Sequence, residues 1–465
     1  MPSSPPLHRA SRVFACLIAL CVAAVAHADG GTRLSFDDAR HLLVRTGFGP
    51  TPTDVKAFEG RTRAEAVDAL LAGARTTPTL PPPTFAQTST PPDERPHPRM
   101  TQDERKALRQ RERMHVQELR SWWLTEMCAT DSPLTERMTL FWHDHFATGV
   151  QKVRDARLMY QQNALFRREA LGNFGTLLHA IARDPAMLVW LDGARNREGD
   201  PNENFAREAM ELFTLGEGHY TQADVANAAR AFTGFVVDRA NDRALYRARL
   251  HDDGEKTMLG VRGRLDADGA IDVLLARPET ATFIVTKLWR EFVSPTPGAG
   301  EVARIADAFR ASHYDIDTAM RALLLSDAFW DAKNRGTLVK SPVELVVGTL
   351  RVLRIGADDL RPAVVATNRM GEALFAPPNV RGWPGGDAWI TSATLLAREQ
   401  FIGRITRAAS GATTNGATMK AKSGEWQRVL LALPPVSAGV VEAVSERDPA
   451  AELRAAMLDP VYELK

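Results

Sequence analysis

Apolar residues recur three and four positions apart along most of this chain of 465 residues. Positions with this spacing fall on one face of a helix, so the pattern predicts amphipathic helices. The expected helices span residues 35–45, 53–71, 101–128, 133–147, 155–170, 173–182, 201–215, 221–233, 268–275, 279–292, 300–311, 315–329, 341–354, 362–375 and 392–408. The sequence therefore predicts an all-α fold, a large irregular helical domain.

Three segments depart from the helical pattern. Residues 246–250 and 257–261 flank an Asp-Asp-Gly turn, which predicts one small β-hairpin near 245–265. Residues 76–98 contain eight prolines, so we expect them to run extended over the surface and not to form a helix. Residues 409–424 are rich in Ala, Gly, Ser and Thr, a composition typical of a flexible connection.

The first residues have the pattern of a secretion signal. His8, Arg9 and Arg12 precede the apolar run 13–26, and Ala-His-Ala follows at 26–28. A basic region, a short apolar region and a small-residue cleavage site in this order indicate export by the general secretion route, to the periplasm or the exterior. No later run is long enough to predict a transmembrane anchor. The predicted organisation is a signal peptide at 1–28, N-terminal helices at 29–75, a Pro-rich surface segment at 76–100, a main helical domain at 101–408, the connection at 409–424 and a C-terminal helical segment at 425–465.

Cysteine content and charge narrow the function classes. Cys16 and Cys21 lie in the predicted signal peptide, so Cys128 alone remains and no intrachain disulfide is expected. Removing residues 1–28 takes away two of 58 basic residues and none of the 57 acidic ones, which leaves a formal charge of −1. This balance gives no reason to expect a nucleic acid as a partner.

Residues 200–216 have the signals that frame a helix. Asp200 is a good N-cap, Pro201 fits the first helical position, and Glu203 could close a capping box. Gly216 could end the helix in the left-handed conformation. We therefore expect the helix at 201–215 to begin directly after Asp200.

One face of this helix is polar. Glu203, Asn204, Arg207, Glu208 and Glu211 fall within an arc of roughly 140°. Such a face is either a solvated surface, with Arg207 paired to Glu203 or Glu211, or a chemical site. In a buried site, Glu208 and Glu211 would push their pKa values apart or bind a cation, and Arg207 and Asn204 would orient them.

The segment 141–149 contains two histidines on a second predicted helix. His145 lies in the middle of its apolar side, and His143 points about 160° away, so the two are not expected to hold one metal. In one interpretation His145 is a hydrogen-bonded core residue and His143 is exposed. In the other, a buried His145 meets carboxylates from another helix, which suits acid–base chemistry or a single metal ligand.

A Pro- and Gly-rich loop at 377–390 carries Arg381, Trp383 and Trp389. Rigid aromatic rings beside a guanidinium could bind a sugar ring or an anionic group, or the tryptophans could simply fill gaps in the core. His251 and Asp252, at the predicted hairpin turn, are secondary candidates, because Asp-Asp-Gly is common in turns. The side chains whose chemistry suits a divalent metal are His143, His145, Glu208, Glu211, His251 and Asp252.

Seven segments together resemble the bacterial domain-of-unknown-function 1800 family. They are residues 45–49, 140–146, 184–188, 201–216, 228–234, 340–344 and 377–389, and the likeness covers nearly all of 35–465. The chain departs from the family pattern at Ala209, where leucine is usual, and at Phe235, where tryptophan is common. The resemblance implies an exported, mostly helical protein, often encoded beside an exported protein with a sulfatase/phosphatase-like fold, and it implies no particular reaction.

Two functions follow as expectations. The first is an exported, hydrolase-like enzyme, with or without a divalent metal, that acts on an envelope polymer such as a polysaccharide. Its catalytic residues would be Glu208, Glu211, His145 and Arg207, and its substrate-binding residues would be Asn204, Arg381, Trp383 and Trp389. The alternative is a non-catalytic scaffold or partner-binding protein, in which the polar motifs are buried ion pairs that hold helices in register.

Overall fold

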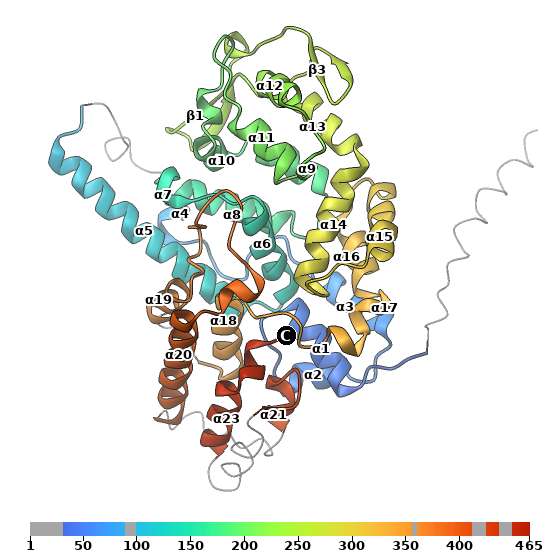
Figure 1. Ribbon diagram of the computed structural model, residues 1–465. Coiled ribbons are helices and arrows are strands. Elements are labelled where there is room, and N and C mark those ends of the chain that lie inside the picture. The colour runs from blue at the N-terminus through green and yellow to red at the C-terminus, as the bar shows by residue number, and fades with distance from the viewer. Residues whose placement is uncertain (1–30, 89–98, 356–359, 412–424, 437–448) are drawn as a thin grey trace, which may run out of the picture.

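The computed structural model describes residues 31–88, 99–355, 360–411, 425–436 and 449–465 (Figure 1). The predicted signal peptide lies outside the described residues, as does most of the predicted connection at 409–424. The first three residues of that connection belong to the end of helix α20 (Ser392–Gly411).

Helices make up 61% of the structure, which confirms the all-α prediction. The first five are α1 (Phe36–Thr46), α2 (Pro52–Phe58), α3 (Arg63–Ala72), α4 (Thr84–Gln87) and α5 (Gln102–Ala129). The middle of the chain forms α6 (Pro133–His145), α7 (Val150–Val153), α8 (Ala156–Arg168), α9 (Phe174–Ile181), α10 (Pro185–Trp190), α11 (Asn204–Glu211) and α12 (Gln222–Ala231). It continues with α13 (Ala267–Ala276), α14 (Pro278–Phe292), α15 (Ala299–Ala311), α16 (Ile316–Leu324) and α17 (Asp327–Trp330). The last part forms α18 (Pro342–Val352), α19 (Arg361–Arg369), α20, α21 (Glu425–Leu430) and α23 (Pro449–Leu458). Short 3-10 turns occur at Gly193–Arg195, Ala248–Leu250, Ala332–Asn334, Gly386–Trp389 (η5) and Pro460–Glu463.

Several helix starts follow from local sequence. The hydroxyl side chains of Ser35, Thr51, Thr62, Thr101 and Ser341 each accept the N–H of an acidic residue three positions later, whose carboxylate accepts the cap residue's own N–H. One prediction is wrong in this region. The helix expected at 53–71 is two helices, α2 and α3, because Gly60 takes a left-handed conformation (φ 80°) and Thr62 starts a new helix.

Helix α11 begins later than predicted. Asp200 is not its N-cap and Glu203 closes no capping box, because the helix starts at Asn204 and its N-cap, Glu203, makes no side-chain capping bond. The side chain of Asn196 accepts the N–H of Asn202 at 2.8 Å and holds the preceding residues out of the helix. Gly216 does take the expected left-handed conformation, but it lies five residues after the end of α11 at Glu211.

The β-structure is small, as predicted, but its strands pair differently. Strand β1 (Phe235–Asp238) pairs with β2 (Arg243–Tyr246), and β3 (Lys256–Met258) pairs with β4 (Val261–Gly263), both antiparallel. The expected partners, 246–250 and 257–261, therefore do not pair. Leu259 and Gly260 both have positive φ, and this tight turn folds β4 back onto β3.

The Pro-rich segment is also partly helical. Residues 84–87 form the single turn α4, contrary to the expectation of a fully extended segment, and Phe85 is buried. Before it, the N–H groups of Thr79 and Leu80 donate to Glu126 of α5 at 2.7 and 2.8 Å. The helical turn begins directly after Pro83, its N-cap, and Phe85 packs against His115 of α5, a contact that sequence reasoning missed.

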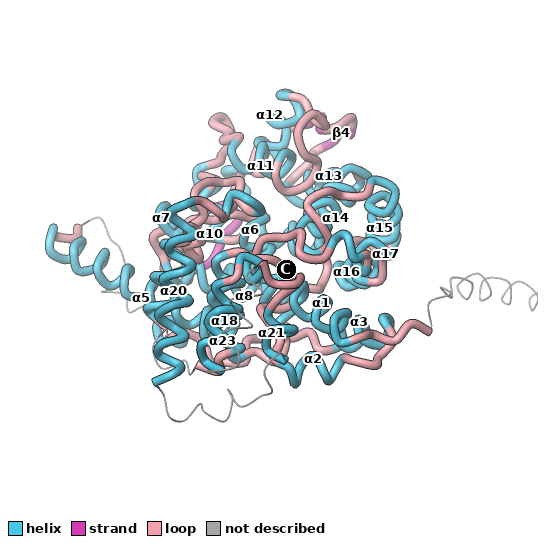
Figure 2. Tube along the Cα trace, turned by 60° about the horizontal axis from the view of Figure 1, so that its bottom comes forward, coloured by secondary structure: helices cyan, strands magenta, loops and turns pink. Residues whose placement is uncertain are grey.

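Two hydrophobic clusters form the core, and α6 contributes to both. The larger cluster gathers residues of α1, α6 and α8 to α17, and the other gathers residues of α5, α8 and α18 to α23. Figures 1 and 2 both show α6 between these two groups of helices. In the described part of the chain, no helix is long and apolar enough to cross a membrane.

Candidate functional site

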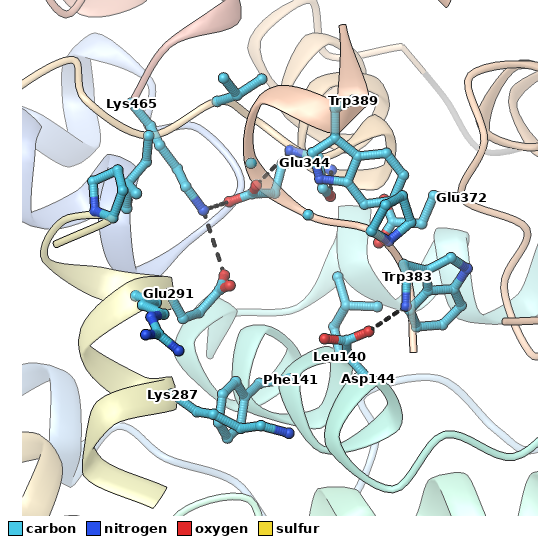
Figure 3. Close-up of a pocket in the computed structure, with 18 of the residues that line it drawn as sticks. Leu140, Phe141, Asp144, Lys287, Glu291, Glu344, Glu372, Trp383, Trp389 and Lys465 are labelled. Carbon is cyan, nitrogen blue, oxygen red and sulfur yellow. Dashed lines mark hydrogen bonds and ion pairs between the residues drawn. The ribbon is translucent and has the colours of Figure 1, made fainter. Parts of the chain in front are cut away.

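A cavity of about 460 Å³ opens beside α6, where the two hydrophobic clusters meet (Figure 3). We call it the central cavity. Its wall is formed by one face of α6, one face of α14, the start of α18, the loop at 372–389 and the last residue, Lys465. A volume of this size lies within the range of small-molecule sites, about 300–1,000 Å³.

Helix α6 presents a mixed face to the cavity. Arg137, Leu140, Phe141 and Asp144 line it at intervals of three and four residues, so they lie along one side of the helix. Pro133 fits the first turn of α6, where its missing N–H would have no intrahelical partner. The chain thus carries a guanidinium and a carboxyl on the same face as two large apolar side chains.

Asp144 is the carboxyl at the lower wall of the cavity in Figure 3. Its Oδ1 accepts the backbone N–H of Trp383 at 2.7 Å. Burial raises its pKa to about 6, and the charge of Glu291 adds to the rise, while the Trp383 N–H and Lys287 oppose it. Part of its surface remains open to the cavity. Gly382 permits this contact, because a Cβ there would lie 2.2 Å from the carboxyl oxygen.

The opposite wall is an ion-pair network. Glu344 accepts from Arg137 at 2.6 Å and from the Lys465 ammonium at 2.5 Å. Glu291 also pairs with Arg137, and it lies 3.4 Å from Lys465. Burial opposes ionisation of Glu344, but Arg137 and Lys465 hold its pKa below the usual value. Glu344 is therefore a charged, compensated group.

Glu372 lies between Asp144 and the ion-pair network around Glu344. It accepts the N–H of Val343 at 2.8 Å, in the first turn of α18. Burial raises its pKa to about 7, although the helix N–H and Ser341 lower it, and the charges of Glu344 and Asp144 contribute to the rise. Asp144 and Glu372 therefore line one cavity as two carboxyl groups that both titrate near neutral pH.

Lys287 and His145 both line the cavity and contact each other. Its ammonium contacts His145 Nδ1 at 3.1 Å and donates to the Leu212 carbonyl at 3.3 Å. Burial lowers the pKa of Lys287 to about 8, with the charge of Asp144 opposing this. Burial and the Lys287 charge keep the pKa of His145 well below its usual value. His145 is thus a neutral, buried wall residue whose polar partner is a lysine.

The loop predicted to bind substrate closes the cavity on one side. Trp383 and Trp389 are buried in its wall, while Arg381 lines it from an exposed position. Arg381 donates to Glu211 at 2.9 Å, and Glu211 also accepts the hydroxyl of Tyr220 at 2.8 Å. The structure thus brings four predicted site residues, His145, Arg381, Trp383 and Trp389, to one cavity, with Glu211 just outside it.

The other residues predicted on α11 do not line the cavity. Arg207 pairs with Glu203 at 2.9 Å, both being more than a third exposed, as the solvated-surface interpretation expected. Asn204 reaches Asp192 at 3.4 Å. Burial, followed by the charge of Glu211, raises the pKa of Glu208. Whether Glu208 and Arg207 take part in a reaction stays a prediction.

His143 is buried, which corrects the interpretation that leaves it exposed. Its ring packs against Trp123, Phe166 and Phe375, and its Nε2 lies 3.1 Å from the Asn163 amide. Helices α5 and α8 cover the side of α6 that periodicity left open.

The remaining metal candidates have protein partners. Asp252 accepts two hydrogen bonds from Arg230, at 2.6 and 3.0 Å, and His251 pairs with Thr233. Among the residues that the structure describes, no group of three or more His, Cys, Asp or Glu side chains is arranged to hold a metal ion. The divalent metal stays a prediction.

Sequence reasoning missed the ionisable groups that dominate the cavity. They are Asp144, Lys287, Glu291, Glu344, Glu372 and Lys465. Asp144 stood between the two histidines of a segment already singled out, and Glu344 closed the motif at 340–344. A signal for both was present, whereas nothing local marks Lys287 or Glu372.

The chain matches the family model described as Protein of unknown function (DUF1800) over residues 41–461, and it belongs to that family. The match includes α6, α14, α18 and the Pro- and Gly-rich loop at 377–390, and it confirms the resemblance drawn from the seven segments. No curated protein and no solved structure matches the chain.

Proposed function

We propose that this DUF1800 protein is an exported hydrolase that cleaves a polysaccharide, or a similar hydroxyl-rich polymer, at a unit held in the central cavity. The observation that carries the proposal is the presence of Asp144 and Glu372 in one cavity wall, with pKa values of about 6 and 7. Acid–base catalysts need pKa values near the working pH, and burial is a common way to raise those of carboxyl groups.

The roles follow from the order of the two pKa values. Between pH 6 and 7, Asp144 is mostly ionised. It takes a proton from a water molecule while the oxygen of that water forms a bond to the reacting carbon. Glu372 is mostly protonated and gives its proton to the departing oxygen as the carbon–oxygen bond breaks. One base and one acid of this kind are the groups that glycoside hydrolysis requires.

The surrounding side chains suit a sugar ligand. The indoles of Trp383 and Trp389 supply flat apolar surfaces, and Arg381 supplies hydrogen-bond donors at the entrance. Glu211, the predicted catalytic carboxylate nearest to the cavity, acts in this proposal by orienting Arg381.

The test is release of new reducing ends from a panel of bacterial and plant polysaccharides by the purified mature chain. We expect kcat/KM to rise through pH 6 and to fall through pH 7. Asp144→Asn and Glu372→Gln should each reduce it by at least about 100-fold. Glu203→Gln, on the outer face of α11, is the control and should change it less than about twofold. Activity that survives both carboxyl changes would contradict the proposal.

A second function is favoured by α5. Its first half, from Gln102 to Arg113, is largely exposed and projects from the body of the protein (Figure 1). We propose as the alternative a non-catalytic scaffold that binds an exported partner of the sulfatase/phosphatase-like fold through this helix. If the panel shows neither hydrolysis nor binding, and charge reversal at Arg105 and Arg109 abolishes co-purification with that partner, the alternative holds.

A further inference from the structure

A second cavity, of about 370 Å³, lies between α1 and α21, away from the groups assigned to hydrolysis. Both the ribbon and the tube view place α21 beside α1 and α2 (Figures 1 and 2). Three arginines line this cavity: Arg40 of α1, Arg335, and Arg428 of α21. We call it the arginine pocket. The side chain of Gln427 adds an amide, and Asp37 is the carboxylate in its wall.

Arg40 is the unusual member. It is only 4% exposed, yet its guanidinium makes one hydrogen bond within the described structure, from Nη2 to the Ala432 carbonyl at 3.1 Å. Its Nε is buried without a partner. A guanidinium has five N–H donors and is always charged, so a buried one normally has a carboxylate or several acceptors around it.

Within the described residues, the neighbouring charges do not supply that compensation. Arg335 already pairs with Asp38, and Arg428 lies 3.5 Å from Asp37 in an exposed pair. Burial lowers the pKa of Arg40 to about 10; Asp37 opposes this, and the charges of Arg335 and Arg428 lower it further. Among the described residues, three guanidinium groups and two carboxylates, Asp37 and Asp38, leave an excess positive charge of one, that of the buried Arg40.

A second buried arginine on the same helix has more hydrogen-bond acceptors, although its Nε is also buried without a partner. Arg45, one turn further along α1, is completely buried, and it donates to the backbone carbonyls of Phe292, Val293 and Asn334. The same helix therefore surrounds one buried guanidinium with three acceptors and leaves the other with one, at the wall of a cavity.

We propose that the arginine pocket binds an oxyanion, as inorganic phosphate or sulfate or as the corresponding ester. The planar guanidinium fork matches the oxygen geometry of phosphate and sulfate, and hydrogen bonds between charged groups are the strong ones. Arg428 is exposed, Arg335 is half-buried and Arg40 is buried. The three guanidinium groups therefore extend from the rim of the pocket to its bottom, where an anion would bind. The pocket is separate from the groups proposed for hydrolysis, so either proposal can fail alone.

Isothermal titration calorimetry on the mature chain tests this site, with sodium phosphate and sodium sulfate added against sodium chloride of equal ionic strength. We expect one anion per chain with a dissociation constant of about 1 mM or lower. Arg428→Gln, at an exposed position, should weaken binding at least about tenfold. Arg321→Gln, which breaks an exposed pair with Asp68, is the control and should leave it unchanged.

Arg40→Gln separates anion binding from a purely structural role. Without anion, this change should leave the thermal midpoint unchanged or higher, because it removes a buried charge, and the rise caused by phosphate should disappear. Glucose 1-phosphate then distinguishes the source: binding at least about tenfold tighter than phosphate identifies an ester, and equal binding identifies the free ion. Absence of saturable binding, or equal binding by the Arg428→Gln and Arg321→Gln variants, would overturn the proposal.

Discussion

Helix α6 carries two carboxyl groups eight residues apart that lie in opposite environments. Glu136 accepts from Arg167 at 2.6 and 2.9 Å and from the Trp123 indole at 2.8 Å, and it is 1% exposed. Asp144 accepts one backbone N–H and keeps part of its surface open to the central cavity. One helix therefore holds a closed ion-pair network at its start and an under-compensated carboxyl at its end.

The difference teaches how to separate structural from chemical polar residues in this fold. A buried charge that is fully paired holds helices in register, and removing one partner leaves the other uncompensated. A buried carboxyl that lacks a cation at hydrogen-bonding distance instead shifts its pKa and becomes reactive toward protons near pH 7. Burial alone does not distinguish the two; the number and charge of the partners does.

The largest effect that we expect is from Glu136→Gln. This change leaves Arg167 buried without a counter-charge, which should cost about 3–5 kcal/mol of unfolding free energy. Urea denaturation followed by circular dichroism measures it. A loss below about 1 kcal/mol would show that the ion-pair network of Glu136 does not have the structural role that the comparison with Asp144 assigns to it.

Gly382→Ala should act on the other end of α6. The new Cβ would lie 2.2 Å from Asp144 Oδ1, at a backbone φ of 87°. Overpacking costs roughly 1–3 kcal/mol and the left-handed conformation roughly 1–2 kcal/mol, so we expect a loss of about 2–5 kcal/mol in the same assay. Gly385→Ala is the matched control: φ is 65° but nothing lies within 4 Å, so only the conformational cost applies.

Asp144→Asn should have the opposite sign. Because the folded-state pKa of Asp144 is raised to about 6, folding is favoured when it is protonated, and this contribution is lost as pH rises from about 4 through 6. The asparagine variant escapes that loss. We expect it to be more stable than the wild type by about 1–3 kcal/mol at pH 7.5.

The pH dependence provides the control for this prediction. At pH 3.5 the wild-type carboxyl is protonated in the folded state, so the two proteins should differ by less than about 0.5 kcal/mol. If Asp144→Asn is instead destabilised at pH 7.5, the carboxylate is a structural group like Glu136. A stabilised variant without activity would place Asp144 among residues kept for function at a cost in stability.

The helices could be predicted from the sequence because their causes are local. Ser35 and Thr101 start α1 and α5 where a capping hydroxyl and an acidic residue stand three positions apart. The prediction was wrong at α11 because its start is decided by Asn196, a residue outside the helix. His143 was misplaced for a similar reason, since periodicity cannot show that two further helices cover the polar side of α6.

The candidate site could be predicted only in part, again for a physical reason. His145, Arg381, Trp383 and Trp389 belong to segments whose composition is unusual, and the structure brings them to one cavity. Glu372 lies at a cavity wall only because the loop after α19 returns to the first turn of α18. No local pattern encodes such a contact, so a pKa near 7 there follows from the tertiary fold alone.

The smallest effect that we expect is from Glu203→Gln on the outer face of α11. The pair with Arg207 spans 2.9 Å, but both side chains are more than a third exposed, so water and salt screen their attraction. The change should cost about 0–1 kcal/mol, and less in 0.5 M sodium chloride than in 0.05 M. Urea denaturation at the two salt concentrations measures both values. A salt-independent loss as large as that from Glu136→Gln would mean that the face of α11 is a closed network too, and the contrast between paired and open carboxyl groups would then no longer single out Asp144.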